Sequence, residues 1–123
     1  MKIVAILSQK GGAGKTTLAL HIAAAAESAG KPSVVIDLDP QASAAGWKDT
    51  RESESPVVVP LPHTRLAAGL QAAKDGGAVL AVIDTAPHSE GAAMAAARAA
   101  DLVLIPCRAG ILDLGQSARP QNW

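Results

Sequence analysis

The segment Ser8-Gln9-Lys10-Gly11-Gly12-Ala13-Gly14-Lys15-Thr16-Thr17 decides the fold of this chain. It follows a short apolar run, Ile3 to Leu7, and opens an alanine-rich helical pattern. A phosphate-binding loop needs this position, because glycines let backbone N–H groups turn towards the phosphates and the helix N-terminus adds partial positive charge. The segment therefore predicts a nucleoside triphosphate site.

Two side chains of this loop carry its chemistry. A lysine at the position of Lys15 reaches the terminal phosphates, and a hydroxyl at the position of Thr16 is a Mg²⁺ ligand. The alternative is a glycine-rich turn that holds no ligand, and the register of Lys15 and Thr16 with the glycines argues against it. The residues expected to contact the nucleotide are Lys10, Gly11, Gly12, Ala13, Gly14, Lys15, Thr16 and Thr17.

The loop departs from the general pattern G-x-x-x-x-G-K-[ST], because Gln9 replaces the first glycine and Lys10 follows it. The resulting Lys-Gly-Gly-x-Gly-Lys-Thr-Thr arrangement resembles the deviant Walker A motif of the ParA/MinD family of ATPases. Three further stretches resemble that family in the same order and spacing: Asp37-Leu38-Asp39-Pro40-Gln41 its switch I segment, Val82-Ile83-Asp84-Thr85-Ala86-Pro87 its Walker B strand end, and Asp101-Leu102-Val103-Leu104-Ile105-Pro106 the strand after it. The likeness runs from Met1 to about Gly115 and points to the small ParA-type partition ATPases of plasmids and chromosomes.

The resemblance implies a catalytic role for Lys10, Lys15 and Asp39. In the family, the lysine at the position of Lys10 crosses a dimer interface to the phosphates on the partner subunit and neutralises charge that develops during phosphoryl transfer. Asp39 is expected to orient the attacking water. The alternatives are an ordinary solvated lysine at position 10 and a local turn of Asp39 before Pro40.

The expected metal ligands are Thr16, Asp39 and Asp84. A Walker B carboxylate at the position of Asp84 holds Mg²⁺ through a water. An aspartate at a strand end can also cap a helix or form a turn, and this alternative stays open. Asp37 is expected to act behind these ligands rather than on the metal itself. ATP or ADP and Mg²⁺ are thus the expected cofactors.

The apolar periodicity predicts an α/β fold. Strands are expected at 3–7, 33–37, 57–59, 78–84 and 102–106, and helices at 15–29, 63–75 and 90–100, with short helical segments at 42–47 and from 111 to 118. This alternation favours a parallel sheet of about five strands with helices on both faces, which is the P-loop NTPase fold that the resemblance implies. Its strand order would be 3-2-4-1-5, which makes the fifth strand an exposed edge. The prolines around 57–59 indicate another edge.

Three polar segments follow apolar strands directly, and ligands of such sheets bind outside the carboxyl ends of the strands. The loop at 10–17, Asp39 and Asp84 should therefore meet in one crevice. We expect residues 1–118 to form a ParA-like P-loop ATPase domain, incomplete at its C-terminal side, and residues 119–123 to be a tail.

Composition narrows the class of protein further. Of the 123 residues, 49% are apolar, yet there is no Phe or Tyr, so Ala, Val, Leu and Ile must fill the core. The formal net charge is zero, which gives no electrostatic case for nucleic-acid binding. A single cysteine, Cys107, excludes an internal disulfide and suits a reducing cytoplasm; we expect it to be a small residue near a strand rather than a reactive thiol. We find no leader and no apolar segment long enough to span a membrane, so the expected location is cytoplasmic.

The expected function is that of a ParA-type ATPase, in which nucleotide state switches a homodimer, DNA association and a ParB-like partner during DNA partition. ParA-type proteins are markedly longer than this chain, and their later part supplies adenine contacts, much of the dimer surface and the DNA-binding residues. A chain that stops at Trp123 is therefore expected to be truncated. The alternative function is a non-catalytic remnant that binds nucleotide or assembles through its exposed edge.

Other candidate residues carry less weight. The three histidines, His21, His63 and His88, lack a metal-ligand spacing. Trp47 could pack over the switch segment or be an exposed anchor, and the lone arginines Arg98 and Arg108 are typical of solvated positions. Cys107 alone cannot supply the cluster ligands of a nitrogenase iron protein. The sequence also lacks a basic amphipathic C-terminal helix of the MinD kind, so no membrane partner is expected.

Overall fold

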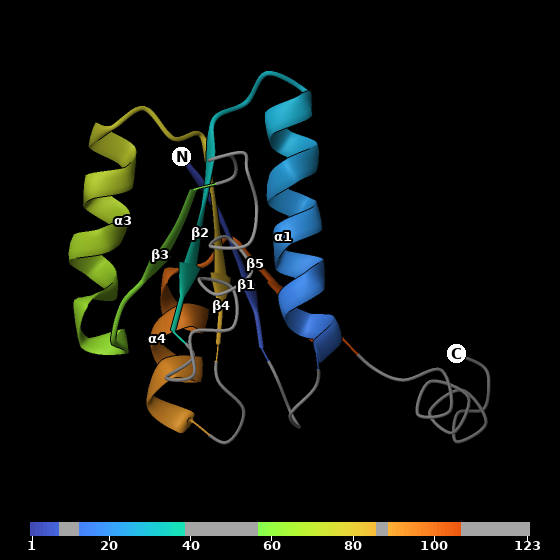
Figure 1. Ribbon diagram of the computed structural model, residues 1–123. Coiled ribbons are helices and arrows are strands. Elements are labelled where there is room, and N and C mark those ends of the chain that lie inside the picture. The colour runs from blue at the N-terminus through green and yellow to red at the C-terminus, as the bar shows by residue number, and fades with distance from the viewer. Residues whose placement is uncertain (8–12, 39–56, 86–88, 107–123) are drawn as a thin grey trace.

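The computed structural model describes residues 1–7, 13–38, 57–85 and 89–106, with only the backbone described at 13–17. Five parallel strands form one sheet in the order β3-β2-β4-β1-β5 (Figure 1). Their bounds are β1 Lys2–Ile6, β2 Ser33–Asp37, β3 Val57–Pro60, β4 Leu80–Asp84 and β5 Leu102–Leu104. The strand order that the resemblance implied is confirmed.

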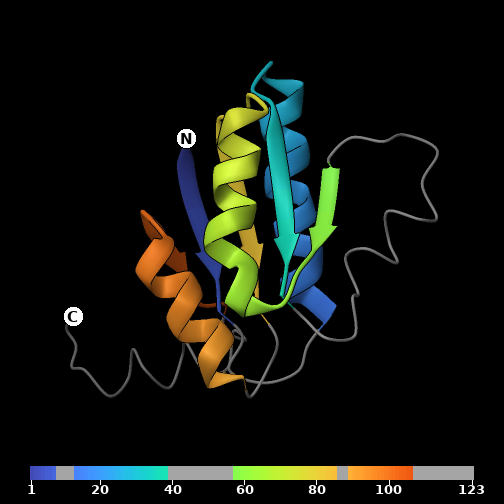
Figure 2. The same cartoon turned by 90° about the vertical axis from the view of Figure 1, so that its left-hand side faces the viewer.

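Helices cover both faces of this sheet, as the α/β prediction requires. Helix α1, Ala13–Ser28, lies on one face, and α3, Leu66–Asp75, and α4, Glu90–Ala99, lie on the other (Figure 2). A 3₁₀ turn, η1, His63–Arg65, leads into α3. None of the helices in the described ranges is long and apolar enough to cross a lipid bilayer.

The predicted boundaries were off by one to three residues at several elements, mainly where the backbone turns. Strand β4 begins at Leu80 rather than Ala78, because Gly77 takes a positive φ of 98° and the chain is still turning out of α3 there. The helix expected from His63 begins as η1 and becomes α-helical only at Leu66. Helix α1 begins at Ala13, two residues earlier than expected. The short helices expected at 42–47 and 111–118 lie outside the described residues.

The core is aliphatic, as the lack of Phe and Tyr predicts. On the α1 face, the buried side chains of β1, β2 and β4 pack against Ala19, Leu20 and Ala23 of α1. On the opposite face, Leu66 and Leu70 of α3 and Ala92 and Ala96 of α4 close a second buried cluster. Because alanine side chains are small, the helices can lie close to the sheet. The core can therefore be densely packed without aromatic residues.

The two edges of the sheet are β3 and β5. Val57 in β3 is 47% exposed, and Leu102 in β5 is 53% exposed. Both edge predictions are therefore confirmed for the sheet that the described residues form.

Candidate functional site

Two buried carboxylates stand at the carboxyl edge of the sheet. Asp37 is the last residue of β2 and Asp84 the last residue of β4, and they are direct register partners in the parallel pair. Asp84 is likewise paired with Ile6, the last residue of β1. Asp37 is 1% exposed and Asp84 is 0% exposed. Three strands thus end side by side, and two of them end in an acid.

Both aspartates belong to the face that α1 covers. Side chains alternate between the two faces of a strand, so Asp37 shares the face of Val35, and Asp84 that of Val82. Val35 and Val82 pack in the cluster that contains Ala19, Leu20 and Ala23 of α1. The acids therefore lie on the side of the sheet where the glycine-rich segment continues as a helix.

Hydrogen bonds join the C-terminal half of α1 to the first residue of β2, so the helix runs antiparallel to the strand. The hydroxyl of Ser33, the first residue of β2, donates to the carbonyl of Ala23 at 2.9 Å, and its amide donates to the Glu27 carboxylate at 2.8 Å. From Ala23 back to Ala13 an α-helix rises roughly 15 Å, and from Ser33 to Asp37 a strand rises roughly 13 Å. The first turn of α1 is therefore level with the two aspartates.

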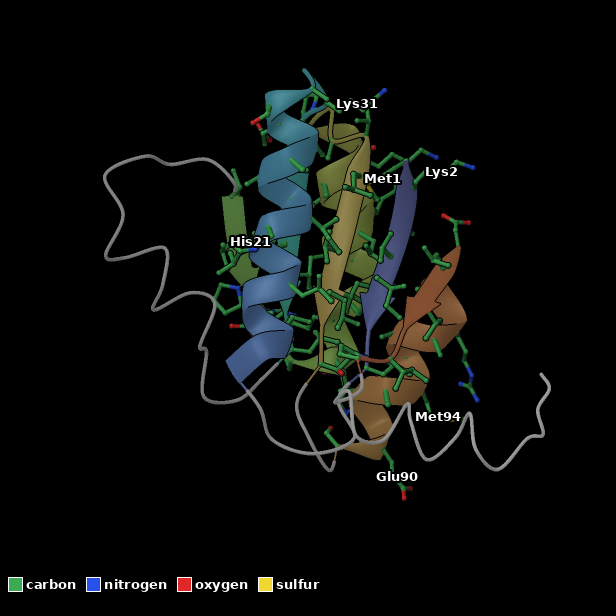
Figure 3. All side chains as sticks on the ribbon, turned by 90° about the vertical axis from the view of Figure 1, so that its right-hand side faces the viewer. Met1, Lys2, His21, Lys31, Glu90 and Met94 are labelled. Carbon is green, nitrogen blue, oxygen red and sulfur yellow. The ribbon has the colours of Figure 1, made fainter. Side chains whose placement is uncertain are left out.

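This turn places the N-terminus of a helix at the acidic edge. Its first N–H groups have no partner within the helix and carry partial positive charge, which favours phosphate. Figure 3 shows the molecule from the α1 side, with Glu90 at this carboxyl edge and Met1, Lys2 and Lys31 at the opposite, amino edge of the strands. The site can therefore combine backbone donors with carboxylates that suit a hard cation.

Backbone hydrogen bonds fix the strand ends in place. The amide of Leu38 donates to the carbonyl of Asp84 at 2.8 Å, and the amide of Leu61 donates to the carbonyl of Asp37 at 3.0 Å. The amide of Leu7 donates to the carbonyl of Leu104 at 2.9 Å. The chain thus stays paired up to the residue before the glycine-rich segment.

Thr85 is a buried residue of this edge to which the sequence reasoning gave no role. Its hydroxyl donates to the carbonyl of Ile6 at 2.9 Å, and its amide donates to the same oxygen at 3.3 Å. The only signal in the sequence was its position directly after Asp84. That position is not enough to identify the partner, because Ile6 lies 79 residues away.

The predicted site residues divide by what the structure describes. Ala13, Gly14, Lys15, Thr16 and Thr17 form the first turn of α1, with their backbone described. Asp84 stands at the edge where the crevice was expected. Three further predicted segments lie outside the described residues: Lys10, Gly11-Gly12 and Asp39. Their roles, and the side-chain roles of Lys15 and Thr16, stay predictions.

Three of the remaining candidates are described, and none of them is a buried residue of this site. His21 and His63 are exposed, as is Arg98 in α4. The other four, Trp47, His88, Cys107 and Arg108, lie outside the described residues. Among the residues that are described, no three His, Cys, Asp or Glu side chains come together as a metal site. Within the described ranges, the carboxylate pair therefore offers two groups that could bind a cation.

Comparison with known proteins identifies the domain. A family model described as "CobQ/CobB/MinD/ParA nucleotide binding domain" matches residues 4–119. Among curated proteins, the chain is 37% identical over 115 residues to the maintenance of carboxysome distribution protein A of Gloeobacter kilaueensis, covering 92% of this chain and 52% of that protein. It is 30% identical over 115 residues to protein ParA of Rhizobium radiobacter, covering 92% of this chain and 51% of the relative. The chain thus spans about half the length of these two curated relatives.

Solved structures show the same fold. Cobyrinic acid a,c-diamide synthase from Mycobacterium smegmatis, with bound ATP analogue and magnesium, superposes with a TM-score of 0.72 at 20% identity, covering 95% of this chain and 66% of that one. Apo McdA from Cyanthece superposes with a TM-score of 0.67 at 22% identity, covering 96% and 64%. These likenesses confirm the predicted P-loop architecture, and the family match confirms the ParA/MinD resemblance that the motifs indicated.

Proposed function

Because this chain belongs to the CobQ/CobB/MinD/ParA nucleotide binding domain family, we propose that it is a ParA-type ATPase that binds ATP and ADP with Mg²⁺. The observation that carries the proposal is the family match over residues 4–119, since that range contains all four motifs read from the sequence. The strand order and the acidic carboxyl edge beside the start of α1 support it.

The donor groups at this edge fit a magnesium nucleotide. Mg²⁺ prefers oxygen ligands and keeps several waters, so it is bound through one or two carboxylates and the substrate phosphates rather than by an all-protein cage. Asp84 supplies such a carboxylate, and Thr16 and Asp39 are the further ligands that the resemblance implies. Bound Mg²⁺ would neutralise charge on the phosphates, which is the chemistry that a P-loop site requires.

The protein's own residues would do the rest of the work. The backbone of 11–17 and Lys15 would hold the phosphates, Asp39 would orient the attacking water, and Lys10 would reach the phosphates held by a second subunit. Hydrolysis would then reset a nucleotide-dependent homodimer in the cytoplasm, where ATP and Mg²⁺ are abundant.

We propose further that this switch distributes a large cargo, with DNA of a plasmid or chromosome as the first candidate and a ParB-like protein as the stimulating partner. Two relatives carry the names ParA and maintenance of carboxysome distribution protein A, so a carboxysome is a second candidate cargo. With a formal net charge of zero, this stretch gives no electrostatic support for DNA contacts, and the segment responsible for them is proposed to lie elsewhere.

The first test is calorimetry of ATP and ADP binding with Mg²⁺. We expect micromolar binding that Lys15→Ala abolishes and that Lys31→Ala leaves unchanged, because Lys31 is exposed at the opposite edge of the sheet. Absence of binding in a folded wild-type sample would refute the proposal.

A second assay separates the ATPase from a non-catalytic remnant. Steady-state phosphate release that is lost in Lys15→Ala and in Lys10→Ala supports an ATPase with a shared dimer site. Nucleotide binding without turnover supports the remnant, which would act by binding or assembly alone.

A further inference from the structure

Thr85 stands where the pairing between β1 and β4 ends. Ile6 and Asp84 are register partners and the last residues of the two strands. The carbonyl of Ile6 accepts the amide of Thr85 at 3.3 Å and the hydroxyl of the same residue at 2.9 Å. The amide bond is longer than is usual for an N–H donor, whereas the hydroxyl bond is well within the usual range. The side chain therefore makes the shorter of the two bonds that close this ladder.

Neither packing nor hydrogen-bond satisfaction calls for a hydroxyl at this position. Thr85 is fully buried, and valine would fill a space of the same shape without a polar atom to bury. The carbonyl of Ile6 already accepts one backbone amide, so it would not be left without a donor in the interior. What the hydroxyl adds is a second bond, which limits how far the end of β1 can move relative to β4.

The two strands that this bond joins lead to the two halves of the proposed site. Strand β1 leads into the glycine-rich segment, and residues 13–17 of that segment form the first turn of α1. Strand β4 ends in Asp84, whose carbonyl accepts the amide of Leu38 from the β2 side at 2.8 Å. The end of β4 is thus bonded to both of its neighbouring strands, and Thr85 makes the bonds to β1.

We propose that Thr85 is a positioning residue for nucleotide binding, because its hydroxyl sets the end of β1 relative to the carboxylate of Asp84. This inference rests on the proposed function and adds to it a residue that acts through the backbone of Ile6. A cation shared by phosphate and carboxylate requires both groups at a fixed separation, and a misplacement of about 1 Å can cost an enzyme on the order of 100-fold. Loosening the end of β1 should therefore weaken the part of binding that phosphate and carboxylate make together.

Calorimetry with ADP tests the inference through a ratio. The affinity of each variant for ADP is measured with Mg²⁺ and again with EDTA, and the ratio of the two affinities reports how well phosphate and carboxylate act on one ion. We expect this ratio to fall about tenfold in Thr85→Val, which keeps the shape of the side chain and removes the hydroxyl. Thr85→Ser keeps the hydroxyl and should keep the wild-type ratio. Thr64→Val, the same change at an exposed position of η1, is the matched control.

The serine variant separates positioning from packing. Thr85→Ser removes a buried methyl group, so a role in packing alone would lower its stability and leave the ratio unchanged in both variants. An unchanged ratio in folded Thr85→Val, or an equal fall in both variants, would overturn the inference while nucleotide binding by the wild type still stands. If the wild type binds no ADP under either condition, the proposed function itself fails. Circular dichroism melting confirms that each variant is folded before the ratio is interpreted.

Amide hydrogen exchange of the unaltered protein covers the case in which Thr85→Val does not fold. The amide of Thr85 shares its acceptor with the hydroxyl, so its exchange reports on this end of the ladder. Val82, in the middle of β4, exchanges with the opening of the sheet and is the internal reference. We expect Mg²⁺–ADP to slow exchange at Thr85 by a larger factor than at Val82, and ADP in EDTA to remove that difference. Equal slowing at both amides would overturn the inference, because it would reflect stabilisation of the whole sheet.

Discussion

The hydroxyl of Thr85 donates a hydrogen bond to the carbonyl of Ile6, and Thr85 is fully buried. This bond joins the end of β4 to the end of β1, the strand that leads into the glycine-rich segment. The same carbonyl also accepts the amide of Thr85. The residue after Asp84 is thus tied to the last residue of the strand that leads into the glycine-rich segment.

Replacing Thr85 with valine should destabilise the protein. Valine keeps the shape of the side chain but removes the hydroxyl, so the carbonyl of Ile6 keeps the longer hydrogen bond, the one from the backbone amide of residue 85. We therefore expect the free energy of unfolding to fall by about 1–2 kcal/mol. Urea denaturation measures this loss. Thr64→Val, at an exposed position in η1, is the control and should change the stability by less than about 0.5 kcal/mol. Equal effects of the two changes would show that the Thr85 bond contributes nothing.

Local patterns were enough to predict the strands, and the family resemblance predicted their order, but neither predicted the individual hydrogen bonds between strands. The range 33–37 was predicted to the residue, because an apolar run between Pro32 and a carboxylate leaves little choice. The bond from Thr85 to Ile6 could not be predicted, since it depends on how β4 pairs with β1.

The misplaced boundaries have similar causes. The apolar residues Ala78 and Val79 look like strand, yet the amide of Val79 donates to the carbonyl of Pro32 at 2.8 Å in the turn that precedes β4. The site was predicted from its motif residues. The burial and register of Asp37 beside Asp84 required the sheet itself.

His63 and Gly91 form a close contact between η1 and the first turn of α4. A Cβ atom added to Gly91 would lie 2.8 Å from Nε2 of His63. Alanine is a better helix former than glycine by up to about 1 kcal/mol. In Gly91→Ala, this gain in helix propensity is opposed by the clash between the new Cβ atom and His63. We expect Gly91→Ala to be neutral or destabilising in the wild type and to stabilise a His63→Ala background by about 0.5 kcal/mol. A double-mutant cycle followed by thermal melting measures the difference. Equal effects in both backgrounds would mean that His63 does not constrain position 91.

Glu27 connects the last turns of α1 to the start of β2. Its carboxylate accepts a hydrogen bond from the backbone amide of Ser33, and Ser33 is a buried residue. Glu27→Ala would leave that amide without this acceptor, and we expect a loss of about 1–3 kcal/mol in urea denaturation. Glu27→Gln keeps an acceptor oxygen and should lose less than half as much. A loss of the same size in both variants would show that charge, rather than the hydrogen bond, is what matters.

Ser89 caps α4, and replacing its side chain should weaken this helix, which follows β4 in the chain. Its hydroxyl accepts the amide of Ala92 at 3.3 Å. Ser89→Ala should lower the stability by about 1 kcal/mol, while Ser89→Asp should retain the cap because aspartate is an equally good N-cap residue. Chemical denaturation of the three proteins tests this order. If Ser89→Asp were as unstable as Ser89→Ala, the cap would not contribute to stability.

Leu102 and Leu104 lie on the same face of the edge strand β5 but differ in burial. Leu102 is 53% exposed, whereas Leu104 packs against the cluster under α1. An exposed apolar edge strand promotes association between sheets, and a lysine on it opposes such pairing. We therefore expect Leu102→Lys to reduce concentration-dependent light scattering while changing the free energy of unfolding by less than about 0.5 kcal/mol. Leu104→Lys should lose about 1.5–3 kcal/mol, because it places an amine where an aliphatic side chain is packed. If both variants lost stability equally, Leu102 would not be an exposed side chain. Unchanged scattering in Leu102→Lys would show that the edge strand does not drive association.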